Sequence, residues 1–326
     1  MTMAFDKHSR WAVALVVLAG CPYGRRPDPP AAPERPVAIA GINSPFDDFN
    51  SVDMTMFTRH QLVFSTNRGS QGANFDLYQA SLSWDSGSLV PGPATPFAAQ
   101  LMSDRDERGP LAFDAREWSH GSYGLWFSLT SDRAGGAGGL DLYATECSGN
   151  YHPHRAVPCG DATELEPLPA LNTSADDAYL SSPFDERSVL FASNREGTRQ
   201  MDIYAARWGA SMTLRHAPAS VTRVDALSSD ADDTAPFVVT AYEKPAELVF
   251  VSSRPGGLGE HDIYCSRYDK GAWSAPKNLG PTINSAKDEY RPIVITVNTT
   301  RFLIFSSTRE GGQGGYDLYI AGYPGC

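Results

Sequence analysis

Five pairs of adjacent acidic residues recur along the chain, each a few residues after an aliphatic residue and a short polar stretch. The pairs are Asp47-Asp48, Asp106-Glu107, Asp176-Asp177, Asp232-Asp233 and Asp288-Glu289. Paired carboxylates can bind a cation, or can act as the acid and the base that hydrolyse a glycosidic bond. They can also be simple counter-charges for arginine. A catalytic residue is usually a departure from a repeat, so the recurrence of these pairs favours a structural role.

An arginine and a further aspartate recur in step with the acidic pairs. Each copy has an apolar segment that ends at an arginine, then a glycine-rich turn, then Asp-Leu-Tyr or Asp-Ile-Tyr. The arginines are Arg68, Arg133, Arg195, Arg254 and Arg309, and the aspartates are Asp76, Asp141, Asp202, Asp262 and Asp317. A buried arginine needs a carboxylate partner. We therefore predict that these ten residues are structural, with the counter-charge supplied by the aspartate or by the acidic pair.

The elements that carry these residues are predicted to be strands. One strand follows each acidic pair, a second ends at the arginine, a third contains Asp-aliphatic-Tyr, and a fourth completes the unit. Five such units predict an all-β fold over residues 37–326, a single five-bladed β-propeller of four-stranded antiparallel blades. The last copy lacks its fourth strand, so we expect Val37–Ile42 to close the ring as an N-terminal strand. In this arrangement the acidic pairs and arginines surround one mouth of the channel.

The repeat resembles the WD40-like repeats of TolB and its relatives. The resemblance rests on the Phe-Ser-Ser-x-Arg turn, as in Phe305-Ser-Ser-Thr-Arg309, and on the following Asp-Leu/Ile-Tyr, and it covers all five copies. It implies a propeller. It does not imply one function, because such repeats occur in envelope lipoproteins and beside peptidase domains.

The N-terminal residues are predicted to direct the protein to the cell envelope. Residues 1–20 contain a short apolar run, Trp11–Leu18, of the length of a signal-peptide core. The following Leu-Ala-Gly-Cys21 resembles the lipobox of bacterial lipoproteins, which implies lipidation of Cys21. Residues 21–36 are rich in proline and are expected to be an extended tether. Pro22 after the cysteine favours the outer membrane, facing the periplasm.

Four cysteines remain beyond Cys21. Cys147 and Cys159 lie close together in one insertion, and we predict that they form a disulfide in an oxidising compartment. The pairing of Cys265 with Cys326 is left open. His152 and His154 lack an obvious third ligand, and we predict neither a metal nor another cofactor.

The function is expected to be binding rather than catalysis. The formal net charge of −11 argues against nucleic acid as a partner, and no nucleophile elbow, zinc-protease or nucleotide motif is present. The main interpretation is a lipid-anchored scaffold that presents a propeller surface to envelope proteins, peptidoglycan or other glycans, with no catalytic residue. The alternative is a five-bladed hydrolase acting on glycans.

Overall fold

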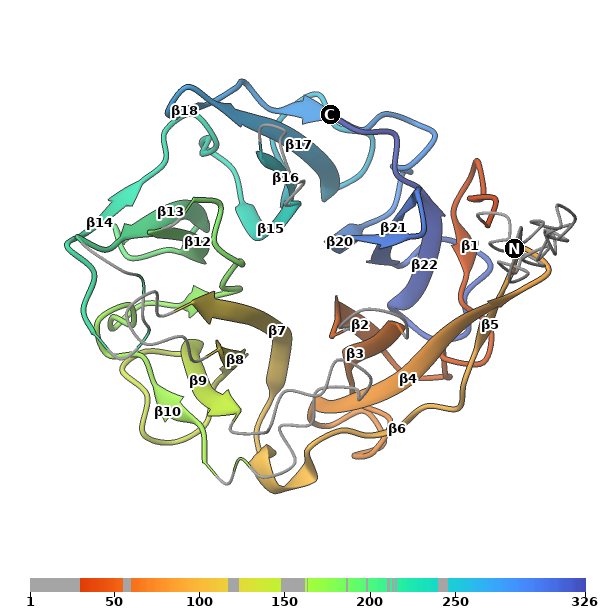
Figure 1. Cartoon of the computed structure of the whole chain (residues 1–326), viewed down its shortest axis with the longest axis horizontal. Coiled ribbons are helices and arrows are strands. Elements are labelled where there is room, and N and C mark those ends of the chain that lie inside the picture. The colour runs from red at the N-terminus through yellow and green to blue at the C-terminus, as the bar shows by residue number, and fades with distance from the viewer. Residues whose placement is uncertain are drawn as a thin grey trace, which may run out of the picture.

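The five repeats fold into five antiparallel sheets arranged in a ring (Figure 1). The computed structural model describes residues 30–54, 60–116, 123–147, 162, 164–185, 187–197, 199–209, 212, 214, 216–239 and 246–326. In the first four blades the strand nearest the ring axis comes first in the chain, and later strands lie progressively farther out (Figure 1). The predicted five-bladed propeller of four-stranded blades is therefore confirmed.

The strand bounds follow the repeat. Blade 1 contains β2 (Asp48–Asp53), β3 (His60–Thr66), β4 (Asp76–Asp85) and β5 (Ser88–Pro91), with β6 (Thr95–Pro96) also paired to β4. After the 3-10 turn η1 (Ala99–Leu101), blade 2 contains β7 (Glu107–Arg116), β8 (Tyr123–Ser131), β9 (Asp141–Cys147) and β10 (Glu166–Pro167). Blade 3 contains β11 (Asp177–Ala178), β12 (Ser188–Ser193), β13 (Asp202–Arg207) and β14 (Ser220–Arg223).

Blade 4 contains β15 (Asp233–Val239), β16 (Ala246–Ser252), β17 (Asp262–Asp269) and β18 (Ala272–Trp273), with β19 (Lys277–Asn278) also paired to β17. Blade 5 contains β20 (Glu289–Val297), β21 (Thr300–Ser307) and β22 (Asp317–Gly322). Its fourth strand is β1 (Val37–Ala38), from the other end of the chain.

The core is built from equivalent residues of the second strands. At one equivalent position, each of these strands has a completely buried phenylalanine: Phe64, Phe127, Phe191, Phe250 and Phe305. Apolar strands that are buried on both faces need neighbours on both sides, and the ring supplies them. The blades are thus mutually dependent.

The ring closes through β1, as the sequence predicts. Val37 pairs with Ile320 and Ala38 with Tyr319, and the Ile39 amide donates to the Leu318 carbonyl. Ile39 and Ile42 are completely buried between blades 5 and 1.

The pairing with blade 5 begins before β1. The Pro33 carbonyl accepts a hydrogen bond from the Gly322 amide at 2.8 Å. Pro33 lies in the segment 21–36, which the sequence predicts to be an extended tether. Because proline lacks only the donor and keeps its carbonyl, a proline-rich segment can still join the edge of a sheet. The contact between the chain ends is thus longer than the sequence suggests.

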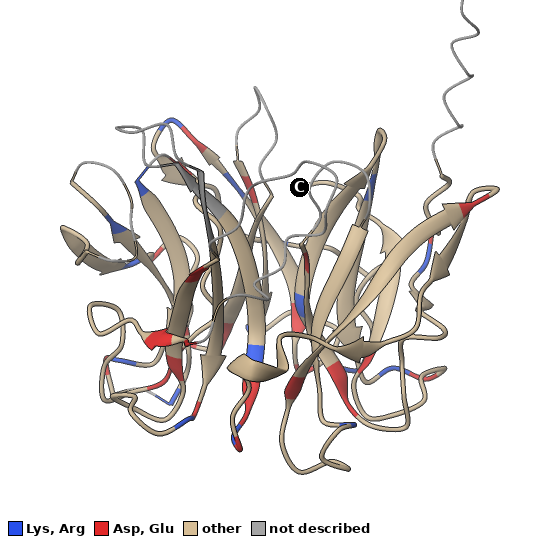
Figure 2. Cartoon of the chain, turned by 60° about the horizontal axis from the view of Figure 1, so that its bottom comes forward, with Lys and Arg blue, Asp and Glu red and all other residues tan. Residues whose placement is uncertain are grey.

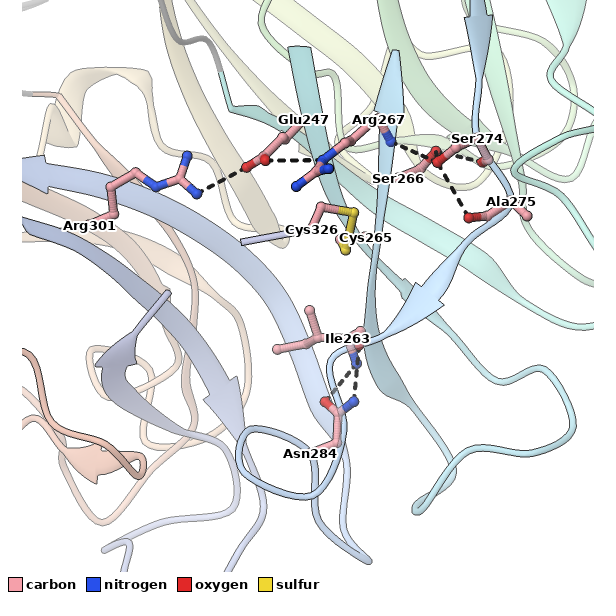
Figure 3. The surroundings of a disulfide bond; sticks show 10 residues. All are labelled: Glu247, Ile263, Cys265, Ser266, Arg267, Ser274, Ala275, Asn284, Arg301 and Cys326. Carbon is pink, nitrogen blue, oxygen red and sulfur yellow. Dashed lines mark hydrogen bonds and ion pairs between the residues drawn. A yellow bond between two sulfur atoms is a disulfide. The ribbon is translucent and has the colours of Figure 1, made fainter. Parts of the chain in front are cut away.

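A disulfide joins the last two blades at their outer edge (Figure 3). Cys265 on β17 is bonded to Cys326, 61 residues later in the sequence. Beside it, Glu247 of blade 4 accepts a hydrogen bond from Arg301 of blade 5. In the chain-entropy model a loop of this length stabilises the fold by about 4 kcal/mol. The pairing that the sequence leaves open therefore links blade 4 to blade 5.

Candidate functional site

The second acid of each pair is the counter-charge of the repeated arginine. The ion pairs are Arg68–Asp48, Arg133–Glu107, Arg195–Asp177, Arg254–Asp233 and Arg309–Glu289, all within 2.8 Å. Each of these carboxylates is completely buried and also accepts hydrogen bonds from the serine or threonine four residues earlier. These carboxylates therefore already have partners inside the protein.

The first acid of each pair joins its blade to the preceding one. Asp47, Asp106, Asp176 and Asp232 accept the backbone amides of Tyr316, Phe75, Leu140 and Met201, respectively. Close packing supports these junctions. A Cβ on Gly259 would lie 2.2 Å from the Lys287 carbonyl oxygen of the next blade, so only glycine fits there.

The aspartate before Leu/Ile-Tyr has a different role from the acidic pair. Asp141 and Asp317 accept backbone amides of their own glycine-rich turns, and Asp262 does the same. Asp202 instead pairs with Arg223 at 2.9 Å. Burial raises the pKa of Asp76 and of Asp317. Asp141, Asp262 and Asp317 therefore fix turns, whereas the second acid of each pair neutralises the repeated arginine.

Figure 2 shows the acidic residues gathered toward one face of the ring. On this acidic face, five aromatic residues form a chain of contacts that we call the aromatic belt. The belt consists of Tyr179, Tyr290, Tyr316, Phe49 and Phe75, with successive ring centroids 6.0, 6.3, 5.9 and 4.6 Å apart. Because it links blades 3, 5 and 1, the belt passes over the ring axis.

Two carboxylates from neighbouring blades contact His261 beside the belt. The His261 ring packs against Tyr290 at 5.8 Å. Its Nδ1 lies 3.1 Å from Asp288, and its Nε2 lies 4.0 Å from Asp232. Asp288 also accepts a hydrogen bond from the Tyr316 hydroxyl at 3.3 Å. Burial, followed by the nearby Asp288 charge, raises the pKa of Tyr316, so its hydroxyl stays a donor at neutral pH.

Asp288 therefore departs from its four counterparts. Their carboxylates hold backbone amides, whereas Asp288 binds the side chains of His261 and Tyr316. Both Asp288 and Asp232 are partly exposed, with 23% and 37% of the side chain accessible. Since both contact one imidazole ring, their nearest oxygens are no farther apart than about 9.5 Å, the upper limit for the two carboxyl groups of inverting glycosidases.

The repeat pattern does not predict this cluster, because His261 and Tyr316 are not repeated residues. The signal was available at two positions: the residue after each acidic pair and the residue before each Asp-Leu/Ile-Tyr. At the latter, Tyr316 and His261 replace the apolar residues found in the other copies.

Of the predicted cysteine and histidine site residues in this paragraph, the structure describes only Cys147. Cys147 is disulfide-bonded, while its predicted partner Cys159, together with His152, His154 and Cys21, lies outside the described residues. In the part of the chain that the structure describes, no three His, Cys, Asp or Glu side chains are grouped to hold a metal ion. No helix in that part has the length and apolar character needed to cross a membrane.

No family model matches the sequence, and no curated protein is similar to it. Solved structures do resemble the fold. A thermostable family-43 glycoside hydrolase is 11% identical with a TM-score of 0.58, covering 87% of this chain and 92% of its own. An α-L-arabinofuranosidase from Podospora anserina, in complex with cellotriose, is 12% identical with a TM-score of 0.55, covering 91% and 95%. A family-43 enzyme from Xanthomonas citri, complexed with xylose, is 11% identical with a TM-score of 0.54, covering 87% and 90%.

These similarities correct the main functional interpretation of the sequence. The sequence favours a non-enzymatic scaffold because its acidic pairs belong to the repeat. The five-bladed ring is instead the fold of the glycoside hydrolases named above. The error arose from treating the five acidic pairs as equivalent, since Asp288 has different neighbours from its counterparts.

Proposed function

We propose that the protein is a glycan hydrolase whose reaction takes place on the acidic face, at Asp288 and Asp232. The observation that carries this proposal is the position of these two carboxylates on either side of His261, next to the aromatic belt. Aromatic rings offer flat apolar surfaces on which the C–H faces of a sugar ring can stack. The five-bladed fold of the similar glycoside hydrolases supports the same function.

The proposed reaction needs one proton donor and one base. Asp288, which His261 and Tyr316 hold in place, takes a proton from water as that water attacks the anomeric carbon. Asp232, the more exposed of the two, gives its proton to the leaving glycosidic oxygen as the carbon–oxygen bond breaks. The products are two shorter sugars, and the two carboxyl groups exchange their protonation states.

Removing either carboxylate should abolish turnover. We expect Asp288→Asn and Asp232→Asn each to lower kcat by about 10²–10⁴-fold, the usual contribution of a general acid or base. Asp230→Asn, two residues away and exposed, should retain full activity. The assay is release of sugar from chromogenic arabinosides, xylosides and galactosides by the full-length protein in detergent. Absence of turnover on all these substrates, or full activity of both variants, would refute the proposal.

We further propose that the enzyme is a lipoprotein of the outer membrane, built from a TolB-type repeat. The support is the lipobox ending at Cys21 and the Phe-Ser-Ser-x-Arg and Asp-Leu/Ile-Tyr pattern. The disulfide between Cys265 and Cys326 agrees with export to an oxidising compartment. In this arrangement the acidic face meets glycans of the envelope or of its surroundings.

Substitution of Cys21 tests the anchor. Lipidation with two or more acyl chains gives stable membrane attachment. The parent protein should therefore enter the detergent phase, and Cys21→Ser should remain in the aqueous phase or unprocessed. Pro27→Ser is the matched control, because it changes a residue near Cys21 without touching the lipobox or the disulfide. Equal partitioning of the Cys21→Ser variant and the parent would exclude a lipid anchor.

A further inference from the structure

Each innermost strand places one residue at the same point near the ring axis, two positions after the second acid. These residues are Asn50, Gly109, Tyr179, Ala235 and Arg291, and all five have a positive φ, between 47° and 58°. The register of the first two strands shifts at this point in blades 1, 2, 4 and 5, which marks a β-bulge. In three blades a proline follows (Pro110, Pro236, Pro292), which a bulge tolerates because its amide is not needed.

Arg291 crosses the axis of the ring. It belongs to blade 5, yet its Nη2 lies 3.4 Å from the Pro110 carbonyl of blade 2. Its guanidinium carbon lies 5.2 Å from the centre of the Tyr179 ring, in blade 3. Neither blade is a neighbour of blade 5, so the side chain reaches the opposite wall. It is also completely buried.

The charge of Arg291 has no carboxylate partner among the described residues, unlike the five repeated arginines. Its Nε and Nη1 have no hydrogen-bond partner there either. Burial lowers its pKa to about 10, so the group remains charged at neutral pH. A buried, unpaired charge costs several kcal/mol. Water could accept hydrogen bonds from these donors but could not neutralise the charge.

Asn50 occupies the equivalent position in the adjacent blade 1. Its side chain is completely buried, and neither Nδ2 nor Oδ1 has a partner among the described residues. Its backbone amide donates to Ser306 of blade 5 at 3.2 Å, which ties it to the blade that carries Arg291. Two kinds of buried donor, one cationic and one neutral, thus occupy equivalent positions on the innermost strands of adjacent blades.

We propose that Arg291 and Asn50 hold a carboxylate-type anion on the axis of the ring. A bound carboxylate would accept hydrogen bonds from the edge of the guanidinium group, as the carboxylate of an aspartate or glutamate does in an ion pair within a protein. The anion is either a small free carboxylate or the carboxylate of an acidic sugar. This site is distinct from Asp288 and Asp232, and it does not depend on the hydrolysis of any glycan.

The test is thermal unfolding of the full-length protein in detergent at pH 7 and constant ionic strength, with acetate as the first probe and glucuronate as the second. A ligand that binds only the folded state raises Tm with its concentration. We expect a rise of about 2–4 °C at several times the Kd. A response to acetate identifies a free small anion as sufficient, whereas a response to glucuronate alone, with glucose as the neutral control, identifies an acidic sugar.

Two variants decide whether the site is at Arg291. Arg291→Met should abolish the rise in Tm, while Arg105→Met, which removes an exposed arginine, should respond as the parent does. Asn50→Asp should place a permanent carboxylate beside Arg291, raise the Tm without added anion, and remove the response. A Tm that is unaffected by both probes in the parent, or an equal response in Arg291→Met, would overturn the proposal.

Discussion

Asp233→Ala is expected to lower the free energy of unfolding by about 3–5 kcal/mol. Asp233 is completely buried and accepts hydrogen bonds from the Ser229 amide and hydroxyl, at 2.6 and 2.7 Å, as well as from Arg254. Alanine removes the counter-charge and leaves the mostly buried Arg254 guanidinium between the Phe250 and Tyr264 rings. The expected loss of stability is large because the Arg254 charge is left without its partner.

Two further variants separate this effect from a general loss of contacts. In Asp233→Ala/Arg254→Met both charges are absent, and much of the lost stability should return, because apolar groups can replace a buried ion pair. Asp225→Ala removes the exposed partner of Arg223, 86% accessible, and should cost no more than about 1 kcal/mol.

Urea denaturation of the parent and these variants supplies the values. Asp177→Ala, at the same position in blade 3, should match Asp233→Ala, since its contacts are the same. A specific ligand-binding role for Asp233 predicts instead that stability is unchanged and that the two blades differ. That result would contradict the structural assignment of the repeat.

The repeated parts of the fold could be predicted from the sequence, because a spacing that recurs in five copies can be recognised, whereas the same spacing in a single copy cannot. The arginine and the acidic pair recur at fixed spacing, and they do meet, as at Arg254 and Asp233. Which acid is the partner could not be predicted. Adjacent residues entering a strand point to opposite sides, and only the packing of the blades shows that Asp232 faces the preceding blade while Asp233 faces its own arginine.

The residues near the ring axis were harder to predict for the opposite reason. Asn50, Tyr179 and Arg291 occupy one repeat position but differ in type, so a search for a consensus passes over them. Their proximity to the axis depends on the order of the blades around the ring. The disulfide between Cys265 and Cys326 is similar, because its cysteines are 61 residues apart and meet only where blades 4 and 5 are neighbours. The spacing of residues along the sequence does not predict such contacts.

Deleting residues 37–42 should open the ring and unfold the domain cooperatively. The deletion removes β1, its pairing with Ile320 and Tyr319, and two completely buried side chains, Ile39 and Ile42. Truncating either isoleucine to alanine is expected to cost about 2–5 kcal/mol. The loss of both, together with the backbone pairing, is comparable with the whole free energy of unfolding of a typical domain, about 5–15 kcal/mol.

Point variants test the closure of the ring without shortening the chain. Ile39→Ala and Ile42→Ala should each lower the Tm clearly, whereas Val37→Ala should not, because Val37 lies on β1 but is 53% exposed. Blade 5 has no other fourth strand among the described residues, so its outer edge depends on this segment. The disulfide of Cys265 with Cys326 links blade 5 to blade 4 and cannot replace a strand on the blade 1 side. Thermal unfolding of the deletion variant in oxidising buffer therefore measures the contribution of β1 alone, because the disulfide stays intact. A Tm equal to that of the parent would mean that the N-terminal strand pairs with blade 5 without holding the ring together.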